Sequence, residues 1–275
     1  MALFRGVFIV AAKRTPFGTF GGKLKNTTAT QLAIAASKAT ILAGKIPPEH
    51  IDSVVMGNVI QSSSDGIYVA RHVGLHSGAP ISSIALTVNR LCGSGFQSIV
   101  TAAEAIALGN SQIVLTGGTE NMSMAPLASY DARWGTRLGI DLKFEDTLWA
   151  GLSDTYCNLP MAITAENLAE KYDISREDCD NYALQTQNRW NEANKDGRFD
   201  EEICSIQVKG KKGKEDFKTD EHPKITTIEQ LAKLKPVFKK NGVVTAGNAS
   251  VSLLIFLRTF NYKYYSNICI RKFRN

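Results

Sequence analysis

The sequence predicts an α/β fold in which helices cover a layered sheet, interrupted by a largely helical insertion. Over the first 120 residues, short apolar runs alternate with amphipathic or alanine-rich stretches, the order typical of strands and helices packed in layers. After Glu120 the alternation ends, because residues 121–160 show no clear period and mix Met, Pro, Gly and Trp. The 275 residues, 44% of them hydrophobic, suffice for one large domain or two smaller ones.

Each element follows from its own pattern. Apolar runs predict strands at 6–11, 53–60, 83–88 and 112–116, and we expect 83–88 to be buried. Helical spacing of apolar residues predicts helices at 30–43, 66–76 and 96–108 between them. In the insertion, the predicted helices span 161–171, 175–194 and 227–234, the second of which opens with the capping-box-like Ser175-Arg176-Glu177-Asp178. A polar, basic turn is expected between them at 209–218.

These elements divide the chain into three parts. Residues 1–120 and 241–250 form one domain, because 243–246 returns to strand composition, and residues 121–240 form the insertion. The tail, 251–275, contains six aromatic residues, no Gly, Pro or acid, and no sustained helical or strand period. Its abrupt change in composition resembles translated non-coding sequence, with an extension that binds a partner or a membrane surface as the alternative.

The charge distribution argues against a nucleic-acid-binding domain. The chain has a formal net charge of +6, but the tail contributes five basic residues and no acid, which leaves +1 for the rest. A basic terminal segment is not a basic domain face. The start is basic as well, because no acid precedes Glu49, and this composition is typical of a mitochondrial targeting segment, although 6–13 also suits a first strand. No apolar run is long enough to span a membrane.

Five cysteines are spread widely along the chain, which favours reduced thiols over disulfides. Cys92 stands out because it lies in the turn between the predicted strand 83–88 and helix 96–108. A thiol there faces the positive end of the helix, which stabilises a thiolate. Gly93 and Gly95 leave room for a substrate carbonyl, and the Cys92 N–H could donate to an oxyanion. Spacing alone allows either a reactive nucleophile or a buried structural cysteine.

Several motifs decide between these alternatives by resemblance to a known family. The run Asn89-Arg90-Leu91-Cys92-Gly93-Ser94-Gly95 resembles the acyl-enzyme signature of the thiolases. The turn 117–123 is similar to their G-G-x-E-x-M-S motif, 161–167 to their M-x-x-T-A-E-N helix start, and 245–250 to the strand that ends their first half. The likeness runs from residue 3 to 250, and details near Ser62 and Asp65 are closest to the mitochondrial 3-ketoacyl-CoA branch.

The resemblance implies a fold and an activity. Thiolases are layered α-β-α-β-α sandwiches of two similar halves, and this chain corresponds to the first half with its inserted loop domain, which contacts coenzyme A. The second half, with its N-E-A-F, G-H-P and C-x-G motifs, is not present. The family performs thiolysis of 3-ketoacyl-CoA in fatty acid β-oxidation, in the mitochondrial matrix, as dimers or tetramers. Coenzyme A and acyl-CoA are substrates, and no metal or bound cofactor is implied.

Residue by residue, the resemblance makes Cys92 the acylated nucleophile. It places Ser250 against the pantetheine of coenzyme A, Phe238 and Ala246 in the walls of that pocket, and Lys224 near the nucleotide phosphates, where a solvated loop lysine is an equal alternative. His72 and His76 have a spacing that could hold a metal, but they lack the H-E-x-x-H pattern. None of the four histidines stands in a G-H-P context, so we expect a reactive thiol without turnover.

Three other functions remain open at this point. The chain could be a non-catalytic thiolase half that pairs with full-length subunits. It could belong to a biosynthetic thiolase that forms acetoacetyl-CoA. It could also derive from another condensing enzyme, such as a ketoacyl synthase, although the 117–123 and 161–167 motifs favour a thiolase.

Overall fold

The computed structural model describes residues 6–210, 213–249 and 266–272. The chain forms two compact units. The first comprises Met1–Met124, Asp200–Glu221 and Lys263–Asn275, and the second comprises Ala125–Phe199 and His222–Tyr262. This division differs from the expected domains, since 200–221 belongs to the first unit and 243–249 to the second.

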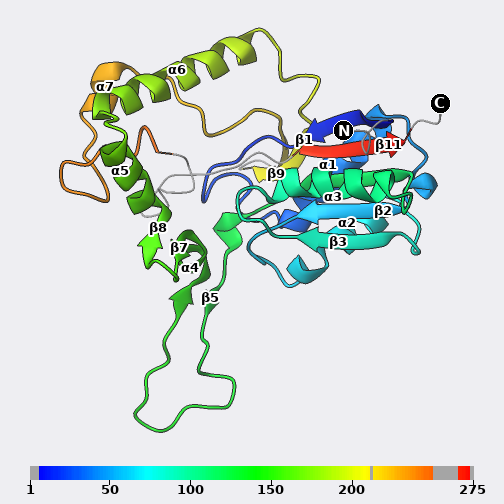
Figure 1. The fold of residues 1–275 in the computed structure, drawn as a ribbon, viewed down its shortest axis with the longest axis horizontal. Coiled ribbons are helices and arrows are strands. Elements are labelled where there is room, and N and C mark those ends of the chain that lie inside the picture. Colours follow the sequence, from blue (N-terminus) through cyan, green and yellow to red (C-terminus); the bar gives the residue numbers. More distant parts are fainter. Residues whose placement is uncertain (1–5, 211–212, 250–265, 273–275) are drawn as a thin grey trace. The chain divides into compact units, whose positions relative to one another are not determined.

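The first unit is built on a mixed five-stranded sheet (Figure 1). Its strands, in spatial order, are β1 (Val7–Arg14), β11 (Ser266–Lys272), β4 (Ile113–Gly118), β2 (Ser53–Gly57) and β3 (Ile84–Val88). The strands β4, β2 and β3 are parallel to one another, and β11 is antiparallel to both of its neighbours.

Helices cover both faces of this sheet. The helices α1 (Ala29–Ala43) and α2 (Val69–His76) pack on one face, and α3 (Ser94–Ala107) packs on the other. Alternate residues of a strand point to opposite faces, so Val54 and Met56 join the core under α1 and α2, whereas Val55 joins the core under α3. The predicted layered α-β-α architecture is therefore confirmed. Single 3-10 turns lie at Pro48–His50, Gly66–Tyr68 and Met122–Met124.

The strand β11 corrects the expectation that the tail lacks regular structure. Its apolar core is the short run Ile268-Cys269-Ile270, which fills the gap between β1 and β4. Cys269 packs into the core under α1 and α2, and Ile270 into the core under α3, each almost completely buried. Three apolar residues are too short a pattern to predict a strand. In the fold, β1 on one side and β4 on the other supply the hydrogen bonds of β11.

The expected buried strand 83–88 lies instead at the edge of the sheet. Ile84 is 66% exposed and Leu86 is 44% exposed, so β3 offers an unpaired edge and an apolar face within the described chain. An apolar run indicates a strand, but it does not show what covers that strand.

A hairpin replaces the expected basic turn at 209–218. The strands β9 (Ile206–Gly210) and β10 (Gly213–Phe217) pair antiparallel, and Ile206, Val208 and Phe217 pack against Leu24 and Leu32. The side chains that alternate with these three face solvent, which gives the segment its polar composition.

Helices dominate the second unit. They are α4 (Thr147–Leu152), α5 (Met161–Lys171), α6 (Arg176–Lys195) and α7 (Ile228–Ala232), with two short ladders, β5 (Leu127–Ala128) with β6 (Glu145–Asp146) and β7 (Ser153–Asp154) with β8 (Leu159–Pro160). The capping box predicted at Ser175 is confirmed, because its hydroxyl accepts from the Asp178 N–H and the Asp178 carboxylate accepts from the Ser175 N–H. The strand expected at 243–246 is instead an irregular turn. Across the described residues, no helix is both long and apolar enough to cross a membrane.

Candidate active site

Cys92 lies in the turn that joins β3 to α3. The preceding residue, Leu91, adopts a left-handed backbone conformation with φ of 47°, which is unusual for a branched residue. The Gly93 N–H donates to the Arg90 carbonyl at 3.0 Å and the Ser94 N–H donates to the Leu91 carbonyl at 3.0 Å. The chain therefore reverses sharply at Cys92 and presents its thiol at the surface.

The hydroxyl of Ser94 stabilises this turn through two hydrogen bonds to its backbone. It accepts a hydrogen bond from the Arg90 N–H at 2.9 Å and donates one to the Leu91 carbonyl at 2.6 Å. Ser94 is fully buried, whereas Arg90 and Leu91 are exposed, so the two hydrogen bonds connect a fixed side chain to a surface turn. Sequence reasoning did not assign this role to Ser94, because a serine in a glycine-rich turn looks like any other small polar residue.

The start of α3 packs directly on the end of β2. A Cβ atom at Gly57 would lie 2.5 Å from the Ser94 backbone carbon and 2.7 Å from the Gly95 nitrogen. Only glycine permits this approach, which places the amino end of α3 and the Cys92 turn against the sheet.

The geometry around Cys92 favours the reactive-thiol interpretation over the structural one. Cys92 is exposed, whereas Cys269 in β11 is buried in the core as a structural cysteine would be. The helix α3 begins at Ser94, so the thiol lies two residues before the positive end of a 14-residue helix. That end favours an anion, either a thiolate or a developing oxyanion.

The buried carboxylate of Glu120 joins the ends of two strands next to this region. It accepts hydrogen bonds from the N–H groups of Val59 and Ile60, each at 3.1 Å, and from the Asn58 amide at 3.1 Å. The glutamate of the 117–123 motif thus fixes the chain after β2, which is a structural role.

No histidine lies in the Cys92 turn, as the sequence shows. His72 and His76 lie edge to face on α2, with ring centroids 6.2 Å apart, and His72 also stacks on Tyr68. Within 6–210, 213–249 and 266–272, no group of three or more His, Cys, Asp or Glu side chains could hold a metal ion. His222 belongs to the second unit, where burial and the charge of Lys224 lower its pKa to about 4.

The residues expected to contact coenzyme A belong to the second unit. Phe238 and Ala246 lie on segments that run antiparallel, because Pro236 and Thr245 form a bridge and the Val237 N–H donates to the Val244 carbonyl at 3.0 Å. The structure thus brings these two segments together. Lys224 is exposed, and its N–H donates to the Gln187 side chain on α6 at 2.9 Å. Ser250 lies outside the described residues.

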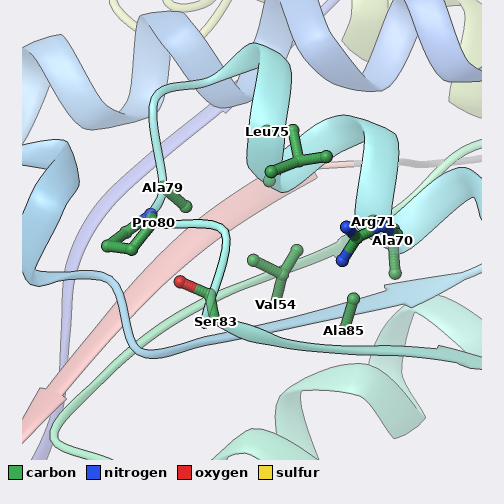
Figure 2. A pocket seen from close by; sticks show the side chains of 9 residues that line it. Val54, Ala70, Arg71, Leu75, Ala79, Pro80, Ser83 and Ala85 are labelled. Carbon is green, nitrogen blue, oxygen red and sulfur yellow. The ribbon is translucent and has the colours of Figure 1, made fainter.

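A groove in the first unit runs along the β3 edge, apart from Cys92. One pocket of about 530 Å³ is lined by residues of the 3-10 turn Gly66–Tyr68, of α2 and of β3, among them Ile67, Tyr68, Arg71, Ile84 and Thr87. A smaller pocket adjoins it, and Figure 2 shows Arg71 and Leu75 of α2 above Ser83 and Ala85 at the start of β3. Neither lining includes a residue of the Cys92 turn.

Comparison with known proteins identifies one family. The sequence pattern described as "Thiolase, N-terminal domain" matches residues 7–252. The mitochondrial 3-ketoacyl-CoA thiolase of Rattus norvegicus is 62% identical over 251 residues, which cover 91% of this chain and 63% of that protein. The acetyl-CoA acetyltransferase of Syntrophomonas wolfei is 43% identical over 249 residues, which cover 90% and 62%. The chain therefore spans less than two thirds of the length of these curated relatives.

Solved structures give the same result. The crystal structure of human mitochondrial 3-ketoacyl-CoA thiolase matches with a TM-score of 0.92 and 56% identity, covering 98% of this chain and 67% of that chain. The human enzyme in complex with CoA matches with a TM-score of 0.91 and 55% identity, covering 99% and 66%. The structural match covers 98% of this chain, against 91% for the sequence match to the Rattus norvegicus protein.

Proposed function

Because this chain belongs to the thiolase family, we propose that it is the amino-terminal portion of an acetyl-CoA C-acyltransferase of the 3-ketoacyl-CoA thiolase type. The observation that carries the proposal is the exposed Cys92 on a turn fixed by Ser94 at the amino end of α3. The identity of 62% to a mitochondrial 3-ketoacyl-CoA thiolase, against 43% to an acetyl-CoA acetyltransferase, favours thiolysis over acetoacetyl-CoA synthesis.

In the proposed reaction, the Cys92 thiolate attacks the 3-keto carbon of a 3-ketoacyl-CoA. The bond between C2 and C3 breaks, acetyl-CoA leaves after C2 takes up a proton, and the shortened acyl group stays on Sγ as a thioester. The thiol of coenzyme A then attacks that thioester, which releases the shortened acyl-CoA and regenerates Cys92. Backbone N–H groups at the amino end of α3 are suited to stabilise the oxyanion in either step.

The protonation of C2 and the deprotonation of the coenzyme A thiol each need an acid or base close to Cys92. The resemblance assigns these groups to the G-H-P and C-x-G motifs, and the 275-residue sequence contains neither motif. We therefore expect this chain to accept one acyl group without turning over.

Stoichiometric acylation tests this proposal. The purified chain is incubated with acetyl-CoA, quenched in acid, and its intact mass is measured before peptide mapping. We expect one acetyl group per chain on Cys92 and none on a Cys92→Ser variant. Cys157→Ser is the matched control, because Cys157 is also exposed and should leave acylation unchanged. Absence of an adduct on Cys92, or an equal adduct on Cys92→Ser, contradicts the proposal.

For coenzyme A, we propose a site with Phe238 and Ala246 in its walls, Ser250 on the pantetheine and Lys224 near the phosphates. The pairing of 236–237 with 244–245, next to Phe238 and Ala246 in the chain, supports the first two assignments. Phe238→Ala should weaken binding of coenzyme A about tenfold, as measured by calorimetry, because the side chain is half-buried and apolar.

We further propose that the chain self-associates, as a dimer or tetramer, in the mitochondrial matrix. The edge of β3, unpaired among the residues that the structure describes, and the exposed Ile84 and Leu86 support association, because natural proteins rarely leave such edges uncovered. The relatives' names place them in mitochondria. Sedimentation of the purified chain tests self-association.

A non-catalytic role is the second candidate. The strand β11 joins β1 to β4 within the sheet of the first unit, and β3 at the edge of that sheet is the surface that this role would offer to a full-length subunit. Co-purification of the tagged chain with a full-length thiolase would support this role, and recovery of the chain as aggregate alone would contradict it.

A further inference from the structure

We propose that Glu166 and Asp180 are positioning residues that hold residues 243–249, and with them one wall of the coenzyme A site, in a fixed shape. The inference rests on the proposed function, because it assigns Ala246 and Ser250 to that site. Residues 243–249 contain no helix or strand, so side chains must set the shape of this segment.

Glu166 holds the beginning of the segment. It lies on α5 and is 3% exposed, and its two carboxylate oxygens accept hydrogen bonds from consecutive backbone groups, Val243 N–H and Val244 N–H, each at 2.9 Å. A Cβ atom at Gly242 would lie 2.3 Å from Oε1, so the carboxylate sits directly against the chain. Hydrogen bonds to a buried carboxylate are shorter and stronger than those between neutral groups.

Asp180 holds the end of the segment from a different helix. It lies on α6, is 2% exposed, and accepts from the Asn248 side-chain amide at 2.8 Å and from Arg176 Nε at 2.8 Å. The same Arg176 donates to the carbonyls of Leu231 and Leu234, at 2.7 and 2.9 Å, at the end of α7. The Arg176–Asp180 ion pair therefore connects the end of the segment, through Asn248, to α6 and to the end of α7.

Asn248 closes the segment on itself. Its side-chain amide also donates to the Val243 carbonyl at 2.8 Å, and its side-chain oxygen accepts from the Thr245 N–H at 2.8 Å. The Ala249 N–H donates to the Thr245 carbonyl at 3.1 Å, one residue before Ser250 in the sequence. Ala246 lies inside this closed turn and is partly exposed, as a wall residue must be.

Glu170 provides a matched control on the same helix. It lies four residues after Glu166 and pairs with Lys239 at 2.6 Å, but its side chain is 71% exposed. Loss of an exposed pair has little effect. A comparison of Glu166→Ala with Glu170→Ala therefore separates the buried contacts to 243–244 from a general change of charge on α5.

The test combines hydrogen exchange of residues 242–249 with the affinity for coenzyme A. In Glu166→Ala and in Asn248→Ala we expect the amides of Val243 to Thr245 to exchange at least about tenfold faster, and coenzyme A to bind about tenfold more weakly. Glu170→Ala should match the wild type in both measurements. The rate at which iodoacetamide alkylates Cys92 should remain unchanged in all variants, and Glu166→Gln should recover part of the affinity.

Three results would overturn the proposal. Unchanged exchange in both alanine variants would mean that these side chains do not hold the segment. Faster exchange with unchanged affinity would mean that the segment does not shape the binding site. If the wild-type chain does not bind coenzyme A, the proposed site itself is wrong, and the inference fails with it. Asn248→Ala keeps the test decisive if Glu166→Ala does not fold, because it leaves both buried carboxylates in place.

Discussion

The position of the Cys92 turn depends on a single glycine in β2. In Gly57→Ala the new methyl group would meet the Ser94 backbone carbon at 2.5 Å and the Ser94 carbonyl oxygen at 2.6 Å, so the start of α3 must shift. We expect a loss of about 1–3 kcal/mol in the free energy of unfolding. Acylation of Cys92 should slow as well, since the turn moves with the helix.

Gly93→Ala is the control for this substitution. Its Cβ would find its closest neighbour, the Arg90 carbonyl oxygen, at 3.4 Å, and its φ of −87° suits any residue. Urea unfolding should show a change of less than about 0.5 kcal/mol. Equal destabilisation by the two substitutions would contradict the close packing of α3 on β2.

A buried ion pair attaches the 200–221 segment to β1. Arg14 is 4% exposed and binds Asp220 through two hydrogen bonds, at 2.7 and 3.1 Å, and Glu202 at 2.6 Å. Although burial opposes its charge, these carboxylates raise the pKa of Arg14. Arg14→Leu should cost about 3–5 kcal/mol, because it leaves the Asp220 charge buried. Arg198→Leu, at the exposed pair with Asp196, should cost less than about 0.5 kcal/mol in the same denaturant titration.

His222 should make the stability of the second unit depend on pH. Burial, assisted by the charge of Lys224, lowers its pKa from 6.5 to about 4, so the folded chain keeps the imidazole neutral where the unfolded chain takes up a proton. The stability that depends on neutral His222 is fully present above pH 6.5. As the pH falls toward 4, the free energy of unfolding decreases by about 1–3 kcal/mol, because only the unfolded chain takes up the proton. His222→Gln should remove this part of the acid sensitivity in melts between pH 4 and 7. The exposed His50→Gln should not.

The elements differ in how well their sequence predicts them. The helix expected at 175–194 agrees closely with α6, because the capping box of Ser175 and Asp178 fixes where it begins. The expectations that failed concern what surrounds an element. The composition of 83–88 indicates a strand but not its edge position, and 243–246 contains two valines whose N–H groups bond to Glu166 rather than to a neighbouring strand. Likewise, the T-A-E-N motif revealed a family resemblance but not that its glutamate holds a segment 77 residues later.

The strand β11 can be tested through its central cysteine. Cys269 is 0% exposed and packs among apolar residues of the core under α1 and α2. Cys269→Ser puts a hydroxyl in that core and should cost about 1–3 kcal/mol in urea unfolding, whereas Cys157→Ser on the surface should cost less than about 0.5 kcal/mol. In the folded wild type, iodoacetamide should modify Cys92 and Cys157 but not Cys269. Rapid labelling of Cys269 would show that β11 does not occupy the sheet.

On the scale of the whole molecule, the second unit exposes a long arm that is rich in apolar side chains. The arm, residues 129–144, joins β5 to β6 and extends from them as a long loop in Figure 1. Trp134 is 94% exposed and Leu138 fully exposed, and Tyr130, Ile140 and Phe144 are exposed as well. Apolar side chains gathered in this way usually mark an interface, which agrees with the proposed self-association.

Trypsin can report on that interface, because Arg133, Arg137 and Lys143 lie among the exposed apolar residues of the arm. We expect these sites to be cut first in a dilute sample, since loop tips with little packing are cleaved before helices. If copies of the chain cover the arm, cleavage should slow as the protein concentration rises through the range in which sedimentation shows assembly. A Trp134→Ser, Leu138→Ser double variant should lose both the assembly and the concentration dependence. Cleavage at an equal rate at all concentrations, in a sample that does assemble, would show that association uses another surface, such as the β3 edge.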